Sequence, residues 1–335
     1  MKKNHEHIML TSAELVFLWN TYMSDSMSIC VFKHFLENIE DDDIKALITH
    51  SLDISQQHLE IVQGIFLEEE IKVPEGFTEK DVNLKAKRLF SDVFYLRYLK
   101  NMTNGGLVSY SRILQHIFRK DIRAFFLKGL NSTMELYNKV TQLILEKGLE
   151  NRPPTIPYPK EIEYIHKQTF VWELFERREA LTGEEVSQLH FNILTNRLGT
   201  GLATAFSQVT ESNKARNYFI RGKEIALKQI RVFSDYLDNN SLPVPMTFDH
   251  EVTDSNESPF SDKLMMYHFG LMIYSGIGNY GAAISASRRS DLVLDFSRLT
   301  AEIMKFAEDG VNIMIDNEWL EQPPLAIARK NKEKD

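Results

Sequence analysis

The chain contains the same sequence pattern twice, and this duplication constrains its fold more than any other feature. Leu10-Thr11 followed by Glu14 returns 171 residues later as Leu181-Thr182 followed by Glu185. One residue is then dropped, and the offset of 170 is kept to the end of both halves. A register that persists over two whole halves indicates that the chain repeats one structural unit. Further matched pairs are Phe35 and Phe206, Pro74 and Pro245, Phe90-Ser91-Asp92 and Phe260-Ser261-Asp262, Tyr110 and Tyr280, and the double prolines at 153–154 and 323–324.

Each half is predicted to form four helices, because its apolar residues recur at alternating spacings of three and four. Ser91 and Ser261 stand at expected N-cap positions, each with an aspartate in the following turn. The first two helices of each half are joined by a few residues, as are the last two. The middle connections, 71–89 and 242–259, are about twenty residues long, which is typical of a crossover in a bundle. The expected helices are 12–38, 42–69, 90–118 and 121–148, then 183–209, 212–240, 260–287 and 290–317.

This connectivity predicts an all-α fold of two tandem ferritin-like four-helix bundles with short–long–short connections. The first bundle is expected over residues 1–155 and the second over 181–325, with a charged tail at 326–335. Residues 156–180 form a linker between them. Four prolines in 151–160 predict an extended start of this connection. The aromatic-rich stretch 162–175 is expected to pack against a bundle and so to hold the two together.

Composition excludes several classes of partner. The net charge is −8 and the charges are interspersed, so neither a nucleic-acid stripe nor a polybasic membrane patch is expected. Cys30 is the only cysteine, which excludes an intramolecular disulfide and favours a reducing compartment. Residues 1–9 lack the apolar run of a secretory signal, so a cytoplasmic location is expected. Residues 264–287 lack Asp, Glu, Lys and Arg, yet their histidine, asparagine and three tyrosines favour a buried helix over a membrane span.

Two polar residues interrupt apolar stripes in the first half. Asp25 lies on the stripe that contains Leu18 and Phe32, and His58 lies on that of the second helix. Both are predicted to face the bundle interior, where a carboxylate and an imidazole can bind one iron, manganese or zinc ion. Glu135 on the fourth helix is a candidate third ligand, although a solvated helix face explains it equally simply. Tyr95 and Tyr98 are candidate hydrogen-bond donors behind the site, or ordinary core aromatics.

The second half provides an internal control. Asp25 corresponds to Asn196, His58 to Gln229, and Glu135 to Lys305, so each group becomes neutral or changes sign. Loss of one metal site after duplication predicts this joint change. The alternative is that both halves hold hydrogen-bond networks and no metal.

Other motifs carry less chemistry. Residues 276–281 spell G-x-G-x-x-G, but they lie inside a predicted helix without the strand that a dinucleotide fingerprint requires. Neither half has Glu-x-x-His where a two-metal carboxylate centre needs it, which disfavours an oxygen-activating enzyme. Cys30 and His34 lie one helical turn apart without a third orienting group, which favours a buried thiol over a catalytic pair. Whether the protein is an enzyme stays open.

Several runs of residues resemble an uncharacterised two-repeat family from spore-forming Gram-positive bacteria, domain of unknown function 3231. They are Tyr-Met-Ser-Asp-Ser-Met (22–27), the helix around His58, Phe90-Ser91-Asp92 with its repeat, residues 279–283, and Trp-Leu-Glu-Gln-Pro-Pro (319–324). The resemblance implies a ferritin-like bundle, sometimes labelled spore-coat-like, and no established activity.

Two functions therefore compete. The first is a protein that binds a single metal ion through His58, Asp25 and Glu135. The second is a structural protein of the spore or stressed cell without metal or catalysis, which assembles as a homo-oligomer or with the spore coat. The sequence identifies no small-molecule partner.

Overall fold

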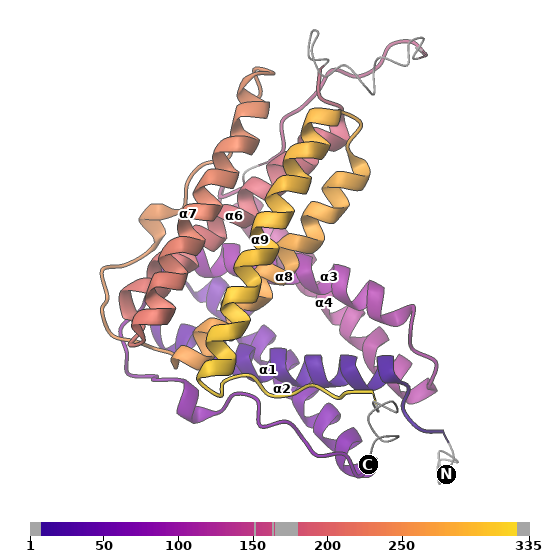
Figure 1. Cartoon of the computed structure of the whole chain (residues 1–335), viewed down its shortest axis with the longest axis vertical. Helices are drawn as coiled ribbons and strands as arrows, with labels where there is room; N and C mark the ends of the chain where they lie inside the picture. Colours follow the sequence, from indigo (N-terminus) through magenta and orange to yellow (C-terminus); the bar gives the residue numbers. More distant parts are fainter. Residues whose placement is uncertain (1–7, 151, 163, 165–179, 327–335) are drawn as a thin grey trace, which may run out of the picture.

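The computed structural model describes residues 8–150, 152–162, 164 and 180–326. Within these residues the chain is all α-helical, and its eight α-helices fall into two groups of four, one per repeat (Figure 1). The duplicated all-α fold predicted from the sequence is confirmed. The first repeat contains α1 (Ser12–Asn38), α2 (Asp42–Glu68), α3 (Asp92–Leu114) and α4 (Lys120–Glu146), and the second contains α6 (Gly183–Val209), α7 (Asn213–Asp238), α8 (Asp262–Ala286) and α9 (Ser290–Asp316). The crossovers carry the short 3₁₀ helices η1 (Glu79–Asp81) and η2 (Asp249–Glu251).

The first helix of each repeat begins with the same capping box. The Thr11 hydroxyl accepts a hydrogen bond from the Glu14 backbone N–H, and the Glu14 carboxylate accepts one from the Thr11 N–H. Thr182 and Glu185 repeat both bonds in the second repeat. These bonds satisfy backbone donors that have no partner inside the helix, which is why the helix begins at this point.

The glutamate of each capping box also holds a distant turn. The second carboxylate oxygen of Glu14 accepts hydrogen bonds from the backbone N–H groups of Phe118 and Arg119, at 3.0 and 2.7 Å. The predicted helix 90–118 therefore ends early, at Leu114, because the turn before α4 is tied to the start of α1. Glu185 binds Arg288 and Arg289 in the same way, at 2.9 and 3.0 Å.

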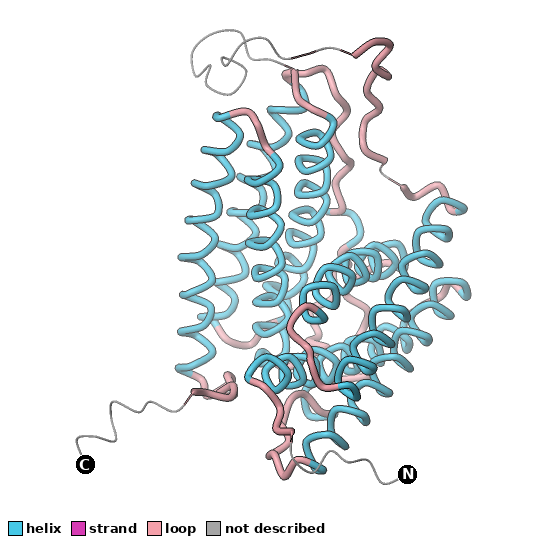
Figure 2. Tube along the Cα trace, turned by 90° about the vertical axis from the view of Figure 1, so that its right-hand side faces the viewer, coloured by secondary structure: helices cyan, strands magenta, loops and turns pink. Residues whose placement is uncertain are grey.

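The apolar core has three parts. Each repeat has a distal cluster of its own, centred on Phe66 and Phe126 in the first repeat and on Phe233 and Phe296 in the second. The largest cluster contains residues of both repeats, so the two groups of helices share one central core. In Figure 1 the helices α6 to α9 run side by side, whereas the α1–α2 and α3–α4 hairpins diverge, and Figure 2 shows the same contrast from the side.

The two crossovers pair with each other and form an inter-repeat seam, which we define as residues 81–91 with residues 251–261. Ser91 N–H donates to the Glu251 carbonyl at 2.9 Å, and the matching bond runs from Ser261 N–H to the Asp81 carbonyl at 3.0 Å. The bond from Asn83 N–H to the Pro259 carbonyl is likewise matched by one from Thr253 N–H to the Leu89 carbonyl, both at 2.8 Å.

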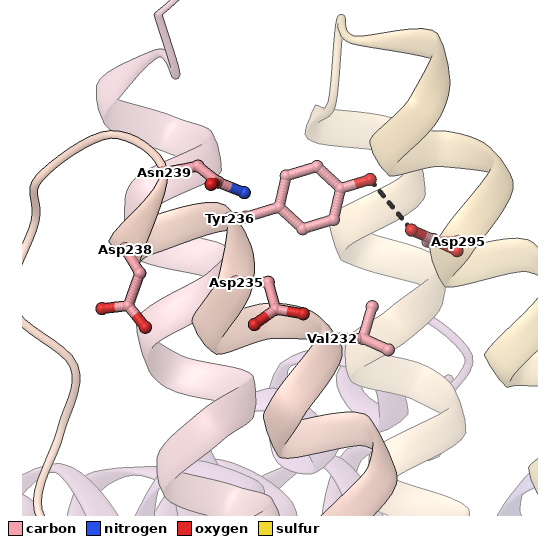
Figure 3. A pocket seen from close by; sticks show the side chains of 6 residues that line it. All are labelled: Val232, Asp235, Tyr236, Asp238, Asn239 and Asp295. Carbon is pink, nitrogen blue, oxygen red and sulfur yellow. Dashed lines mark hydrogen bonds between the residues drawn. The ribbon is translucent and has the colours of Figure 1, made fainter.

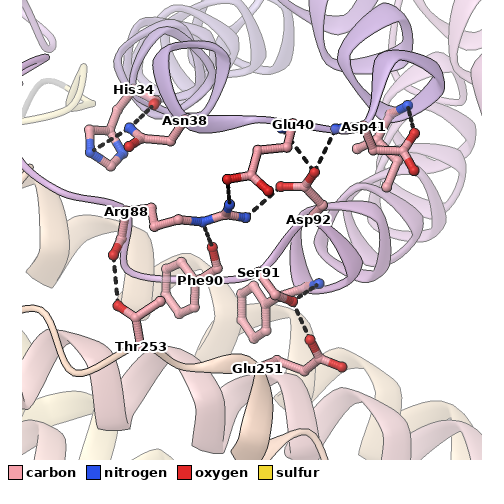
Figure 4. Close-up of polar contacts among 12 residues, drawn as sticks. His34, Asn38, Glu40, Asp41, Arg88, Phe90, Ser91, Asp92, Glu251 and Thr253 are labelled. Carbon is pink, nitrogen blue, oxygen red and sulfur yellow. Dashed lines mark hydrogen bonds and ion pairs between the residues drawn. The ribbon is translucent and has the colours of Figure 1, made fainter.

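The side chains of the seam are reciprocal as well. Figure 4 shows the Ser91 hydroxyl on the Glu251 carboxylate, and Ser261 makes the equivalent contact with Asp81 at 2.7 Å. The Tyr98 hydroxyl meets His268 Nε2 at 2.9 Å, and these two residues are each other's counterparts in the duplication. Each repeat therefore presents the matching positions of its surface to the other, in a pseudo-twofold arrangement.

The connecting segment contributes little to this arrangement where it is described. Tyr158, Ile162 and Tyr164 are 92, 84 and 75% exposed. The remainder of the predicted packed stretch, residues 163 and 165–175, lies outside the described residues, as does the tail 327–335. Among the described residues, the crossovers and the shared core join the repeats, whereas the sequence predicted that the linker would do so.

The charge-poor stretch 264–287 forms most of α8 and is placed in the protein interior through Leu264, Met265 and His268. None of the helices in the described ranges combines the length and apolar character needed to cross a membrane.

Candidate functional site

The first repeat brings together Asp25 of α1 and His58 of α2, as the sequence predicted. His58 Nδ1 lies 3.2 Å from Asp25 Oδ2, and the side chains are 5 and 16% exposed. The hydroxyl of Tyr110 on α3 lies 3.4 Å from the same His58 nitrogen. Three helices of the first repeat therefore meet in one small polar cluster.

The second repeat builds a cluster from the matching positions. Asn196 of α6 donates its side-chain N–H to the Tyr280 hydroxyl at 2.8 Å, and that hydroxyl donates to Gln229 Oε1 of α7 at 2.7 Å. Gln229 and Tyr280 are 0 and 1% exposed. The three positions thus keep their proximity although the acid and the imidazole have become amides. We call these two clusters the polar layers.

Each polar layer lies between two apolar layers. Along α1, Leu18 belongs to the distal cluster and Met27 to the central one, with Asp25 between them. Along α7, Phe219 belongs to the central cluster and Phe233 to the distal one, with Gln229 between them. A buried polar group must find partners, so each layer fixes how its three helices face one another.

Glu135 does not join this cluster. It lies on the exposed face of α4, next to the exposed Met134, which agrees with the solvated-face interpretation. Among the described residues, no group of three or more His, Cys, Asp or Glu side chains is placed to hold a metal ion. Zinc sites in proteins use three or four protein ligands, so the two groups present do not complete such a set. A bound iron, manganese or zinc ion stays a prediction.

Tyr95 and Tyr98 lie in the central core rather than beside His58. The Tyr98 hydroxyl is at the seam with His268, and the Tyr95 ring stacks on Phe35 with centroids 4.0 Å apart. The tyrosine that completes the polar layer is Tyr110, one of the residues repeated between the halves. Its return as Tyr280, at helical spacing from Gly106 and Gly276, was the available signal.

Electrostatics differ between the polar layers. Burial raises the pKa of Tyr110, and the nearby Asp25 carboxylate raises it further. Burial also raises the pKa of Tyr280, whereas its hydrogen bond with the Asn196 side chain acts in the opposite direction. Both tyrosines are therefore protonated near neutral pH and serve as hydrogen-bond partners.

A pocket lies near the C-terminal end of α7, facing α9 (Figure 3). Its carboxylates are Asp235, Asp238 and Asp295. Asp295 accepts a hydrogen bond from the Tyr236 hydroxyl at 2.9 Å and pairs with Arg298 at 2.9 Å. The first repeat has glycine, leucine and phenylalanine at the positions that match the three aspartates, so the acidic lining is not repeated there.

The other residues considered from the sequence, the Cys30–His34 pair and the glycine-rich run, have roles in packing. Cys30 is buried, its thiol faces the Thr78 carbonyl at 3.4 Å, and burial raises its pKa to about 12, so it is a thiol rather than a thiolate. His34 Nε2 bonds to the Ala86 carbonyl at 3.1 Å instead of pairing with that thiol. The G-x-G-x-x-G run lies within α8, without the strand a dinucleotide site needs.

Together these features define a class: an all-α protein of two duplicated four-helix units joined by a pseudo-twofold seam, each with a buried polar layer. The family described as "Protein of unknown function (DUF3231)" matches residues 1–162 and again 169–331. The chain belongs to this family and contains two copies of it.

Two relatives are each about one repeat long. The "Uncharacterized protein YvdQ" of Bacillus subtilis (strain 168) is 26% identical over 147 residues, which cover 42% of this chain and 85% of that protein. The crystal structure of a "putative spore coat protein" from Bacillus halodurans C-125 matches with a TM-score of 0.41 and 19% identity, over 44% of this chain and 97% of that one.

Proposed function

We propose that this protein is a structural component of the spore, built as a rigid two-repeat scaffold, and that its polar layers fix helix packing. One observation carries the proposal. Both repeats place a hydrogen-bonded trio at the same three positions, and the trio of the second repeat is uncharged. A role in packing requires partners of suitable size and polarity at these positions, and amides meet that requirement as well as an acid and an imidazole.

The cellular context comes from the family. The sequence resemblance is to a family of spore-forming bacteria, and the family is now assigned over both halves of the chain. A scaffold role also agrees with the shared core, in which buried aromatic residues of both repeats pack together. Such a core makes the two repeats a single folding unit rather than two independently moving modules.

Localisation during sporulation tests this proposal. The chain would be fused to a fluorescent protein and expressed in sporulating Bacillus subtilis, with the free fluorescent protein under the same promoter as control. We expect fluorescence at the spore periphery and recovery of the fusion in the extracted coat fraction. A fusion that stays dispersed in the mother-cell cytosol and is absent from purified spores would overturn the proposal.

A protein that binds one iron, manganese or zinc ion is the rival function. It is favoured by the Asp25–His58 pair, which only the first repeat contains. Against it, Glu135 lies apart on the exposed face of α4, and two protein ligands leave most of an ion's coordination to water. Elemental analysis of protein purified without chelators decides between the two. Stoichiometric metal in the wild type that disappears in His58→Gln would favour the ion-binding function.

A further inference from the structure

The seam pairs unlike repeats through contacts that do not depend on how the repeats are connected. Each seam bond joins a residue of the first repeat to a residue of the second, and its symmetric counterpart does the same. Helix α4 ends at Glu146 and α6 begins at Gly183. The intervening chain can span on the order of 100 Å when extended, far more than the width of one bundle. The covalent connection therefore does not determine which second repeat a given first repeat meets.

Another contact restricts the pairing to unlike repeats. Gly201 of α6 lies against the ring of Phe94 from α3, and a Cβ atom at Gly201 would lie 2.6 Å from Phe94 Cε2. Phe94 is fully buried and stacks on Phe90, so its ring has little freedom to move away. The first repeat has Cys30 at the position of Gly201. Two first repeats paired through this surface would therefore force the Phe94 ring of one against Cys30 of the other.

Two second repeats would fit poorly for the opposite reason. Leu264 stands at the position of Phe94, and a leucine facing Gly201 would leave the space of the phenylalanine ring partly empty. Unfilled space in a core lowers stability in proportion to its volume. The pair of Tyr98 and His268 at the pseudo-twofold axis is also unlike, and it supplies one well-placed hydrogen bond.

We propose that a second copy of this chain can supply the partner repeat, so that the first repeat of each copy docks on the second repeat of the other and forms an exchanged dimer. The exchanged dimer keeps every seam contact of the monomer. Its population is then set by protein concentration against the effective concentration that the covalent connection imposes. Crowded assembly or refolding at high concentration favours the exchange.

A disulfide trap tests this directly in the full chain. Val82 and Phe260 face each other as an antiparallel bridge, at a spacing that a disulfide can span. In a Cys30→Ser background, one chain would carry Val82→Cys and another Phe260→Cys. The two would be unfolded together, refolded over a series of concentrations and oxidised. A single chain with both cysteines is the positive control, and Met304→Cys, on the exposed surface of α9, replaces Phe260→Cys in the collision control.

We expect a disulfide-linked pair of chains whose yield rises with concentration to at least tenfold above the collision control. The duplication places Phe90 opposite Val82 if two first repeats pair, so mixing Val82→Cys and Phe90→Cys chains should give no more than the collision control. Absence of the Val82–Phe260 bridge between chains, while the single-chain control is fully bridged, would overturn the proposal. Efficient Val82–Phe90 bridging would equally overturn the restriction to unlike repeats.

A glycine pair on α6 sharpens the test. Adding Gly201→Ala to the Phe260→Cys chain alone should leave the interchain yield nearly unchanged, because the clash with Phe94 occurs once in the variant monomer and once in the exchanged dimer. Adding Phe94→Leu to the Val82→Cys chain as well should raise the yield at least fivefold, because only the exchanged dimer then pairs the two substituted positions with each other and Phe94 with Gly201. Gly199→Ala is the matched control, because a Cβ at Gly199 meets no atom within 4 Å. Circular dichroism confirms that each variant is helical. In the presence of Phe94→Leu, equal yields for Gly199→Ala and Gly201→Ala would contradict the proposed role of the Phe94 contact.

Discussion

The two repeats place polar side chains at the same three positions but connect them by different hydrogen bonds. In the first repeat His58 is central, with Asp25 at 3.2 Å and Tyr110 at 3.4 Å on one nitrogen. In the second repeat the Tyr280 hydroxyl is central and bonds both amides within 2.8 Å. The comparison teaches that the architecture requires a polar layer at this level of the bundle and accepts more than one chemistry there.

The capping glutamates are the feature that the repeats share most closely, and removing them should have the largest effect. Glu14→Ala and Glu185→Ala each remove a helix cap and leave backbone N–H groups of a partly buried turn without partners, so each should lower the free energy of unfolding by on the order of 3–5 kcal/mol. Urea denaturation measures the loss. Glu14→Gln, which keeps an acceptor oxygen, is the control and should lose less than half as much. A large loss of stability for only one of the two alanine variants would show that the two capping glutamates are not equivalent.

His268, the histidine of the seam, should make the protein less stable as the pH falls below neutrality. Burial lowers the pKa of His268 to about 4, whereas an unfolded histidine titrates near 6.5. Between these values the unfolded state binds a proton that the native state does not, so stability is complete above pH 6.5 and declines as the pH falls toward 4. The expected loss from this group is about 3 kcal/mol.

Urea denaturation at pH 7.5 and 4.5, for the wild type and His268→Gln, measures this contribution. The wild type should lose more stability than the variant between the two pH values. The counterpart in the first repeat, Tyr98, does not titrate in this range, because burial raises its pKa. Equal losses in both proteins would contradict a neutral buried histidine at the seam.

Replacing the tyrosine of each polar layer should destabilise the two repeats to different extents. Tyr280→Phe removes two short hydrogen bonds and leaves Gln229 and Asn196 unpaired, at an expected cost of about 2–3 kcal/mol. Tyr110→Phe removes one long contact and should cost less than about 1 kcal/mol. Thermal and urea unfolding of the two variants provide the measurement. A reversed order would mean that the first repeat relies on its tyrosine more than the geometry indicates.

Replacing the acid and the imidazole of the first polar layer with the amides of the second should have the smallest effect on stability. The double variant Asp25→Asn with His58→Gln reproduces the amide pair beside a tyrosine that is already present. We expect a change in unfolding free energy within about 1 kcal/mol, because amides satisfy the same layer in the second repeat. A loss of stability that appears only in the presence of added iron, manganese or zinc would instead favour the ion-binding function.

Much of this arrangement could be predicted from the sequence, because helices leave local signals. The apolar spacing and the caps placed α1 at Ser12–Asn38 and α6 at Gly183–Val209 as expected. The same spacing predicted that Asp25 and His58 face inward, and in the structure the two side chains are in contact. Helix α3 ends before its predicted end because a distant carboxylate, that of Glu14, holds the following turn. A local pattern contains no information about that contact.

The sequence alone determined the duplication, the number and order of the helices in each repeat, and the inward polar positions, since these follow from periodicity and capping within single segments. Only the tertiary structure decided that the crossovers of the two repeats pair with each other, that Tyr110 and not Tyr95 or Tyr98 completes the polar layer, and that Glu135 faces solvent. The physical reason is that these outcomes depend on contacts between segments as many as 180 residues apart in the chain. Such contacts are selected by shape and hydrogen-bond complementarity across the folded core rather than by any pattern within one helix.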